Sequence, residues 1–214
     1  MPLASLLWTV ASRGVKVWTG SFLSHSMRSI SPSKPGGGAY HALLGTLEQV
    51  GIATAIAVPI GVLTALYLIE YSRGNRLGRS ISFFIDVMTG VPSIVAGLFI
   101  YSSWVLTFGF DRSGFAASLA LTILMLPVIV RATEEMLRIV PSDLREASYA
   151  LGIPKWKTIV RVVIPTAIGG IITGVMLAVA RVSGETAPLL LTTFLSQSIN
   201  SNPFKGPDRK STRL

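Results

Sequence analysis

The sequence lacks cysteine altogether and carries little charge. With no cysteine in 214 residues, a disulfide framework and a thiolate metal site are both excluded. The two histidines, His25 and His41, have no carboxylate cluster beside them, so no metal site is predicted. Charged residues make up 14% of the chain, against about 25% in a typical soluble domain. Hydrophobic residues make up 50%, a composition typical of a membrane protein.

The charge that is present is mostly basic and clustered. The formal net charge is +9, a balance that in a soluble protein would point to nucleic acid. Here the basic residues lie between long apolar runs, where Lys and Arg set the orientation of membrane helices. We therefore predict that the chain lies in membrane lipid and has no nucleic-acid partner.

Four apolar runs approach or exceed the length of about 20 residues that crosses a bilayer. They lack the period-two alternation that marks a membrane β-barrel. The sequence therefore predicts an all-α fold, a polytopic bundle of transmembrane helices. The four runs are Leu43–Ile69, Ile81–Phe110, Phe115–Val130 (the shortest) and Ile159–Ala180.

The segments between these runs predict the orientation of the bundle. Tyr71–Ser80 and Arg131–Arg161 are rich in Arg and Lys, whereas the segment around Asp111 holds a single basic residue. Because cytoplasmic loops carry the excess of Lys and Arg, the two basic segments are predicted inside and the segment around Asp111 outside. Glu70 is expected only to mark the inner end of the first run. Asp86 is expected to neutralise a basic partner or to lie near the inner interface.

The two ends of the sequence do not fit a complete membrane protein. Residues 1–42 are predicted to hold the remnant of a first span, apolar through Val10, and an external loop that begins at Ser12. Residues 43–194 form the predicted transmembrane domain. Residues 195–214 form a polar, basic tail that would lie outside, against the rule for positive charge. We interpret the chain as truncated at both ends, with a genuine external tail as the alternative.

One inside segment, residues 133–158, has mixed charge and the pattern of a helix, a turn and a second helix. Pro141 is expected to stop one helix, and Gly152 permits a C-terminal turn after the next. By spacing alone, a solvated amphipathic loop that merely joins two spans is an equal alternative. Small side chains that would let another surface approach closely are Ala147, Ser148 and Ala150.

The same segment resembles the EAA motif of ABC importer permeases. That motif reads Glu-Ala-Ala, three residues, Gly, nine residues and Ile-x-Leu-Pro. The chain has Glu146-Ala147-Ser148, Gly152 and Pro165 at these spacings. The resemblance implies a coupling helix that docks into a groove on a separate ATP-hydrolysing subunit. Since no Gly-rich run ends in Lys-Ser or Lys-Thr, we expect that the chain is not an enzyme and binds no cofactor. ATP would be used by the partner subunit.

Two charged residues, Arg181 and Glu185, follow the fourth apolar run. Charges at membrane depth are costly and indicate function. Their spacing of four predicts that they share a helix face, although Gly184 and Pro188 weaken or end that helix. A neutral ion pair at the external interface is the alternative reading.

Two stretches, Leu177–Phe194 and Asp86–Gly97, resemble the permease family of phosphate importers. The likeness runs from about Gly45 to Thr193. It implies a MetI-like permease fold with six spans in the bacterial inner or plasma membrane, of which the first is mostly missing here and the sixth is absent. The residues expected along the substrate pathway are Arg181, Glu185, Thr186, Pro92 and Ser93.

The chemistry of phosphate agrees with the pair of charges. Phosphate near neutral pH is an anion that keeps at least one proton. Arg181 offers a fixed positive fork for the phosphate oxygens, and Glu185 can accept the P–O–H hydrogen bond. Sulfate has no proton to donate, so a carboxylate at that position would repel it.

The second apolar run is interrupted in its middle, at Pro92 and Ser93. Pro92 frees a backbone carbonyl, which protein or cavity water must satisfy. Broken helices often line a translocation path. A packing kink, with Gly90 and Gly97 at a helix crossing, is an equal alternative.

We therefore predict the transmembrane permease subunit of an ATP-driven importer that moves inorganic phosphate into the cytoplasm. The implied partners are ATP-hydrolysing subunits at residues 133–158, a second homologous permease subunit and an external phosphate-binding protein. Two alternatives stay open. One is an ABC permease for another oxyanion, such as sulfate or molybdate. The other is a secondary transporter without an ATPase partner.

Overall fold

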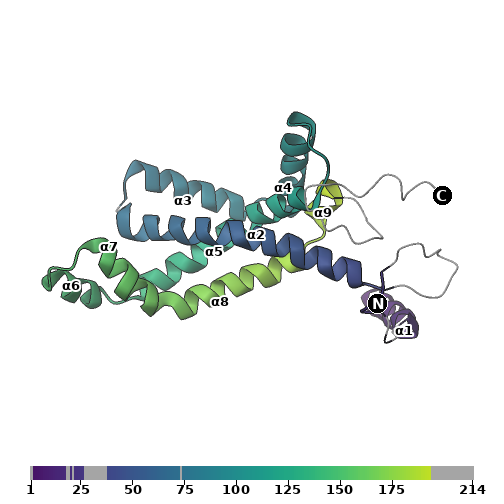
Figure 1. The fold of residues 1–214 in the computed structure, drawn as a ribbon, viewed down its shortest axis with the longest axis horizontal. Helices are drawn as coiled ribbons and strands as arrows, with labels where there is room; N and C mark the ends of the chain where they lie inside the picture. Colours follow the sequence, from purple (N-terminus) through teal and green to yellow (C-terminus); the bar gives the residue numbers. More distant parts are fainter. Residues whose placement is uncertain (1, 18–19, 21, 27–37, 73, 194–214) are drawn as a thin grey trace.

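The computed structural model describes residues 2–17, 20, 22–26, 38–72 and 74–193, and its regular elements there are all helical. Long helices lie side by side along one axis of the molecule (Figure 1). The all-α fold is therefore confirmed. In chain order, with η denoting π-helical segments, the elements are α1 (Pro2–Val17), α2 (Tyr40–Leu66), η1 (Tyr67–Tyr71), α3 (Arg76–Thr89), α4 (Ser93–Ile100), η2 (Tyr101–Thr107), α5 (Gly114–Ile139), α6 (Ser142–Ala150), α7 (Lys155–Thr158), η3 (Ile159–Val163), α8 (Ile164–Ser183) and α9 (Ala187–Thr192).

Three continuous helical stretches in the described part of the chain are long and apolar enough to cross a membrane. They are Tyr40–Tyr71, Gly114–Ile139 and Lys155–Ser183, and they contain the first, third and fourth predicted runs. The stretch that contains the third run is the shortest of the three, as predicted, with 26 residues, although α5 continues nine residues beyond Val130 to Ile139. The charges that end the apolar run lie inside this helix, where Arg131 and Glu134 neutralise each other.

The second predicted run does not form one kinked helix. Its two parts, Arg76–Thr89 and Ser93–Thr107, are bent by 108° relative to each other and together form a broken span or a re-entrant loop. Gly90 ends α3, and Pro92 precedes α4 with a non-helical ψ of 139°. The ring of a proline disfavours the helical conformation of the residue before it, here Val91. The chain therefore leaves one helix at Gly90 and starts another after Pro92.

The central helix is α5, which contacts α2, α3, α4, α8 and α9. The most apolar 18-residue part of α5 is 56% buried. The corresponding parts of the two spans that contain α2 and α8 are each 28% buried. The outer helices therefore keep broad apolar faces exposed on the isolated chain, as expected where lipid or another subunit covers them. Fully buried residues along α5 include Ala116, Ala120, Leu121, Met125 and Ile129.

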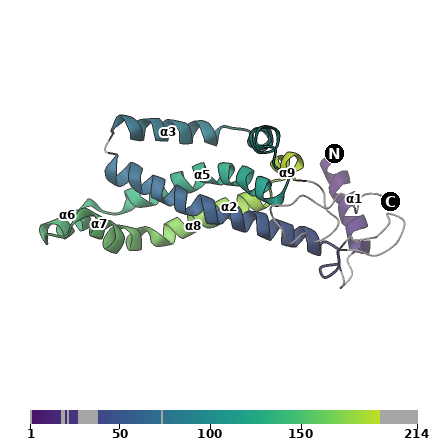
Figure 2. The ribbon, with the colours of Figure 1, turned by 45° about the horizontal axis from the view of Figure 1, so that its top comes forward.

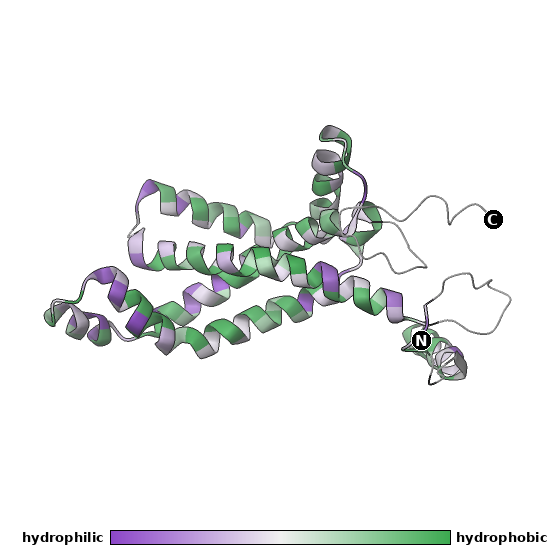
Figure 3. Cartoon of the chain, viewed as in Figure 1, coloured by the Kyte–Doolittle hydropathy of each residue, from purple (hydrophilic) through white to green (hydrophobic). Residues whose placement is uncertain are grey.

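The bundle has two distinct ends, which two views place toward opposite ends of the long helices, with α1 beyond the second of them (Figures 1 and 2). The α6 end comprises η1, the start of α3, the end of α5, and α6 with α7. The α9 end comprises the start of α2, α4 with η2, and α9. Hydrophilic residues gather at the α6 end, while the long helices are mostly hydrophobic (Figure 3). Both basic segments predicted inside thus lie at one end, and the segment around Asp111 lies at the other.

The N-terminal part differs from its prediction in one respect. The apolar start of the chain is a helix, but α1 runs to Val17, so the external loop predicted from Ser12 begins later. The expectation failed because Ser12, Arg13 and Lys16 are polar and were interpreted as loop, although none of them breaks a helix. Most of the remaining loop and the tail of residues 195–214 lie outside the described residues.

Candidate coupling and transport sites

Helix α6 is set off from α5 by a short break in the backbone. Val140 has an extended conformation with ψ of 120°, and Pro141 occupies the N-cap position of α6. Asp143 lies in the first turn of α6, where the partial positive charge of a helix N-terminus favours a carboxylate. The helix, turn and helix predicted for residues 133–158 are confirmed, although the first helix is the end of the α5 span.

Gly152 closes α6 with a left-handed turn. Its φ is +73°, a value that glycine adopts without the steric cost paid by other residues. The backbone N–H of Ile153 donates to the carbonyl of Ser148 at 3.2 Å, and that of Gly152 to Tyr149 at 2.9 Å. The first of these bonds is typical of a Schellman turn. The structural prediction for Gly152 is therefore confirmed.

The residues of the EAA-like motif differ in their exposure to solvent. Glu146 and Ala147 are exposed, as is Gly152 in the turn, whereas Ser148 is buried. The hydroxyl of Ser148 lies 2.8 Å from that of Thr158, which is also buried. Ser148 therefore holds α6 against the start of the next helix and is approached by this chain's own α7.

Pro165, the last residue of the motif, lies in the first turn of α8, beyond η3, rather than in the turn between α6 and α7. Proline has no N–H to donate, and its ring crowds the carbonyl four residues earlier. A widened π-helical turn, η3, directly precedes it at Ile159–Val163. Pro165 therefore shapes the start of the span rather than the exposed surface of α6.

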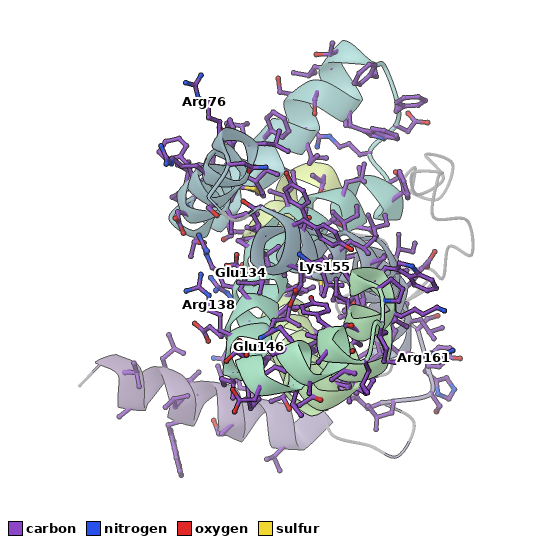
Figure 4. The ribbon with its side chains drawn as sticks, turned by 90° about the vertical axis from the view of Figure 1, so that its left-hand side faces the viewer. Arg76, Glu134, Arg138, Glu146, Lys155 and Arg161 are labelled. Carbon is purple, nitrogen blue, oxygen red and sulfur yellow. The ribbon has the colours of Figure 1, made fainter. Side chains whose placement is uncertain are left out.

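The turn after α6 presents apolar side chains that the sequence analysis did not single out. Leu151 is 79% exposed and Trp156 is 59% exposed, on either side of Gly152. Tyr149 on α6 is exposed as well. Figure 4 looks onto this end of the molecule, with Glu146 and Lys155 labelled on it. These exposed apolar residues lie among polar ones, so they are candidates for contact with a partner protein. They flank the turn predicted at Gly152, and that position is the signal in the sequence that could have identified them.

Helix α6 is attached to the end of the first long helix through Glu70, which lies in η1. The side chain of Glu70 is 6% exposed, and it accepts a hydrogen bond of 3.1 Å from Arg145 Nε. Arg145 also donates to the carbonyls of Val140 and Leu137, each at 2.9 Å. It so satisfies carbonyls at the C-terminal end of α5, where a helix leaves them without helical partners. Lys155 Nζ donates to the backbone carbonyl of Glu70. The expectation that Glu70 only marks the end of a span is therefore wrong.

A pocket of about 550 Å³ adjoins this attachment. It lies among η1, the end of α5 and α6, and it opens at the α6 end. Its charged lining residues are Glu70, Arg138, Arg145, Glu146 and Lys155.

A second charged cluster lies farther along α5. Arg131 donates to Glu134 at 2.5 Å, to Asp86 on α3, and to the carbonyl of Ser82 at 3.2 Å. The Glu134 side chain is 5% exposed. The expectation that Asp86 neutralises a basic partner is confirmed, and that partner joins α3 to α5.

The predicted anion-binding residues do not share a helix face. Arg181 lies in the last turn of α8, but Gly184 ends that helix, and Glu185 follows in the turn before α9. Thr186 is the N-cap residue of α9. Within the described residues, the ion pairs involve Arg131 and Arg145, and none joins Arg181 to Glu185. The spacing of four residues was misleading because Gly184 intervenes.

The interrupted second run meets the end of the fourth. Helix α4 packs against α9, and a Cβ built on Gly97 would lie 2.6 Å from Pro188 Cα. Gly97 is thus required at this helix crossing, as the packing alternative expected, whereas Gly90 only ends α3. Pro92 and Ser93 lie at the start of α4, Pro92 exposed and Ser93 half-buried. The structure therefore brings together, through α4 and α9, the two stretches that resemble the permease family of phosphate importers.

The apolar helices of the bundle are long enough to cross a membrane, and comparison with known proteins gives the class of membrane protein. Residues 57–202 match the family model of the binding-protein-dependent transport system inner membrane component. Among solved structures, an inward-facing MetNI methionine ABC transporter is similar, with a TM-score of 0.58, 23% identity and 71% of each chain covered. At that identity the likeness supports the fold alone. An amino acid ABC transporter has a TM-score of 0.52 at 26% identity, covering 65% of this chain and 68% of the other.

Curated relatives narrow the class. The phosphate transport system permease protein PstA 1 of Mycobacterium tuberculosis (strain CDC 1551 / Oshkosh) is 56% identical over 207 residues, which are 96% of this chain and 68% of the relative. The phosphate transport system permease protein PstA of Haemophilus influenzae is 41% identical over 200 residues, covering 94% and 70%. The chain belongs to the PstA family of phosphate transport system permeases. It is a transport subunit of the inner membrane, and not an ATPase.

Proposed function

We propose that this chain forms part of the path by which an ATP-driven importer moves inorganic phosphate into the cytoplasm. The observation that carries the proposal is α6, a helix with an apolar tip exposed at one end of the bundle. It lies inside the region that matches the binding-protein-dependent transport family. That match argues against a secondary transporter without an ATPase.

The α6 end is the cytoplasmic side in this proposal, because both basic segments lie there. An ATP-hydrolysing subunit docks on Glu146, Ala147 and the turn at Gly152. Leu151 and Trp156 supply apolar area beside them. ATP binding closes the paired ATPases and moves α6, which tilts the spans in an alternating-access cycle. The chain itself binds no cofactor, and ATP is used by the partner.

Phosphate is the proposed substrate, by the names of the relatives and by the residues at the α9 end. Arg181 binds the phosphate oxygens, and Glu185, in the turn that follows, accepts the P–O–H hydrogen bond. Thr186 follows Glu185 along the same path. Because the turn frees Glu185 from the helix, its carboxylate is not held on the same face as Arg181. Pro92 and Ser93 begin a helix that packs against α9 and extend the path.

The remaining partners complete the importer. A second, homologous permease subunit covers part of the apolar surface that α2 and α8 leave exposed, and membrane lipid covers the rest. An external phosphate-binding protein delivers phosphate at the α9 end. This assembly follows the general arrangement implied by a binding-protein-dependent system.

The experiment that tests the substrate is uptake of phosphate and of sulfate in cells that lack their own PstA-type permease. The unsubstituted protein should import phosphate and not sulfate, and should stop when ATP is depleted. Glu185→Gln should weaken that selectivity, because an amide no longer repels an anion without a proton. Unchanged selectivity in Glu185→Gln would remove Glu185 from the proposal. Sulfate uptake by the unsubstituted protein would favour the other oxyanion.

A further inference from the structure

Glu70 is a buried acid that the proposed transport path does not use. It is the only acidic residue between Glu48 and Asp86, and its side chain is 6% exposed. It lies in η1, a π-helical segment at the end of the first long helix. Such segments occur frequently at functional sites. A buried carboxylate of this kind requires partners, because an isolated charge is costly to bury.

Both helices of the α6–α7 segment are tied to this one residue. Arg145 of α6 donates to the Glu70 carboxylate, 3.1 Å away, and Lys155 at the start of α7 donates to the Glu70 carbonyl. Lys155 Nζ also lies 4.7 Å from the centre of the Tyr71 ring. The contacts join residues 75 and 85 positions apart in the sequence. These contacts tie α6 and α7 directly to the segment that ends the first long helix.

The same guanidinium group reaches a third element. Arg145 donates to the carbonyls of Leu137 and Val140 at the end of α5, each at 2.9 Å. Its side chain is 18% exposed. One arginine therefore holds together α6, the end of α5 and the end of α2, the two long helices with the most extensive mutual packing in the bundle.

We infer that Glu70 and Arg145 form the mechanical link by which movement of the ATPase-docking helix α6 reaches the spans α2 and α5. Glu70 is a positioning residue: it contacts neither ATP nor phosphate, and it acts through Arg145 and Lys155. This inference rests on the proposed docking of an ATPase at α6. The inference adds which residues of the permease receive the movement of α6.

A link of this kind predicts uncoupling rather than loss of assembly. Without the carboxylate charge, α6 keeps its exposed surface, so the ATPase still docks and hydrolyses ATP. The displacement of α6 is no longer passed fully to α2, and fewer phosphate ions move per ATP. Substitutions along coupled elements change coupling by about 0.5–2 kcal/mol, so we expect the ratio of phosphate moved to ATP hydrolysed to fall about 2- to 30-fold.

The test uses the complete transporter, with its ATPase, second permease and phosphate-binding protein, reconstituted in lipid vesicles. ATP hydrolysis and phosphate uptake are measured in the same vesicles. The variants are Glu70→Gln, which keeps the shape and an acceptor oxygen, and Arg145→Lys, which keeps the charge but loses the fork. The matched control is Glu135→Gln, the same chemical change at an exposed position of α5.

The inference expects Glu70→Gln to hydrolyse ATP with a reduced ratio, Arg145→Lys to lie between it and the unsubstituted protein, and Glu135→Gln to be unchanged. A full ratio in Glu70→Gln, or hydrolysis and uptake falling in parallel, overturns it and leaves the proposed function intact. An unsubstituted transporter whose uptake does not depend on ATP would overturn the proposed function and this inference together.

A covalent link provides an independent arm, because the chain has no cysteine of its own. The double variant Glu70→Cys with Arg145→Cys is prepared in a transporter whose other subunits are also free of cysteine. We expect a low ratio before treatment and a higher one after a short bifunctional thiol reagent joins the two positions. If the joined and unjoined forms transport with the same ratio, the link carries no movement and the inference is wrong.

Discussion

The two ends of the bundle carry the same types of charged residue in different surroundings. At the α6 end, Glu70, Arg145 and Lys155 are joined to one another or to backbone carbonyls, and the surface left outside includes exposed Leu151 and Trp156. At the α9 end, Arg181 is exposed, and within the described residues it forms no ion pair with the half-buried Glu185. Charge fastens helices at the first end, and it suits binding of an anion at the second.

The largest expected effect comes from breaking a fastened charge. Arg131→Leu leaves Glu134 buried without its partner, so we expect the free energy of unfolding in detergent to fall by about 3–5 kcal/mol. Titration with a denaturing detergent measures this value. The double variant Arg131→Leu with Glu134→Leu should recover most of the loss, because the buried carboxylate is removed together with its partner. A double variant as unstable as the single one would contradict the fastening role.

A charge at the α9 end should behave in the opposite way. Arg181 is exposed, so Arg181→Ala should change the free energy of unfolding by no more than about 0.5 kcal/mol. Phosphate uptake should fall about 10- to 150-fold, the equivalent of one hydrogen bond to a charged group at about 1.5–3 kcal/mol. Uptake in cells and unfolding in detergent are measured on the same variant. A stability loss as large as that of Arg131→Leu would erase the difference between the two ends.

The smallest effect concerns packing at the α9 end. At Gly97 a new Cβ would meet the backbone of Pro188 at 2.6 Å, so Gly97→Ala should lower the free energy of unfolding by about 1–3 kcal/mol through overpacking. Gly169→Ala is the matched control, because nothing lies within 4 Å of a Cβ there. In that helix interior, alanine should stabilise by about 0.5–1 kcal/mol. Equal effects of the two substitutions would contradict the close approach of α4 and α9.

The limits of the helices at the α6 end were predictable because residues at those limits determine them. Pro141 and Gly152 fix where α6 begins and ends, and each acts on its own stretch of backbone. The pairing of Glu70 with Arg145 and that of Arg131 with Asp86 were not predictable in the same way. Each pairing joins residues on two different helices, and sequence spacing carries no information about which helices lie side by side.

Errors in the prediction arose where one local signal competed with another. The apolar run was expected to end at Val130, but α5 continues because Arg131 pairs with Glu134 and Asp86. Arg181 and Glu185 were expected on one face by spacing, but Gly184 ends α8 between them. In the second run, the glycine and proline around Val91 together produce a bend of 108°, beyond what a proline kink alone suggested. The division of the chain into residues 1–42, 43–194 and 195–214 stays a prediction.

The account assigns ATPase docking to the α6 end and phosphate binding to the α9 end. The most direct test is the amount of ATPase that co-purifies with the permease. Gly152→Asp places a side chain and a charge at a position with φ of +73° in the exposed turn after α6, whereas Arg181→Ala alters only the opposite end. We predict that Gly152→Asp loses the ATPase and that Arg181→Ala retains it while failing to import phosphate. Retention of the ATPase and of ATP-driven uptake by Gly152→Asp, or loss of the ATPase by Arg181→Ala, would contradict the account.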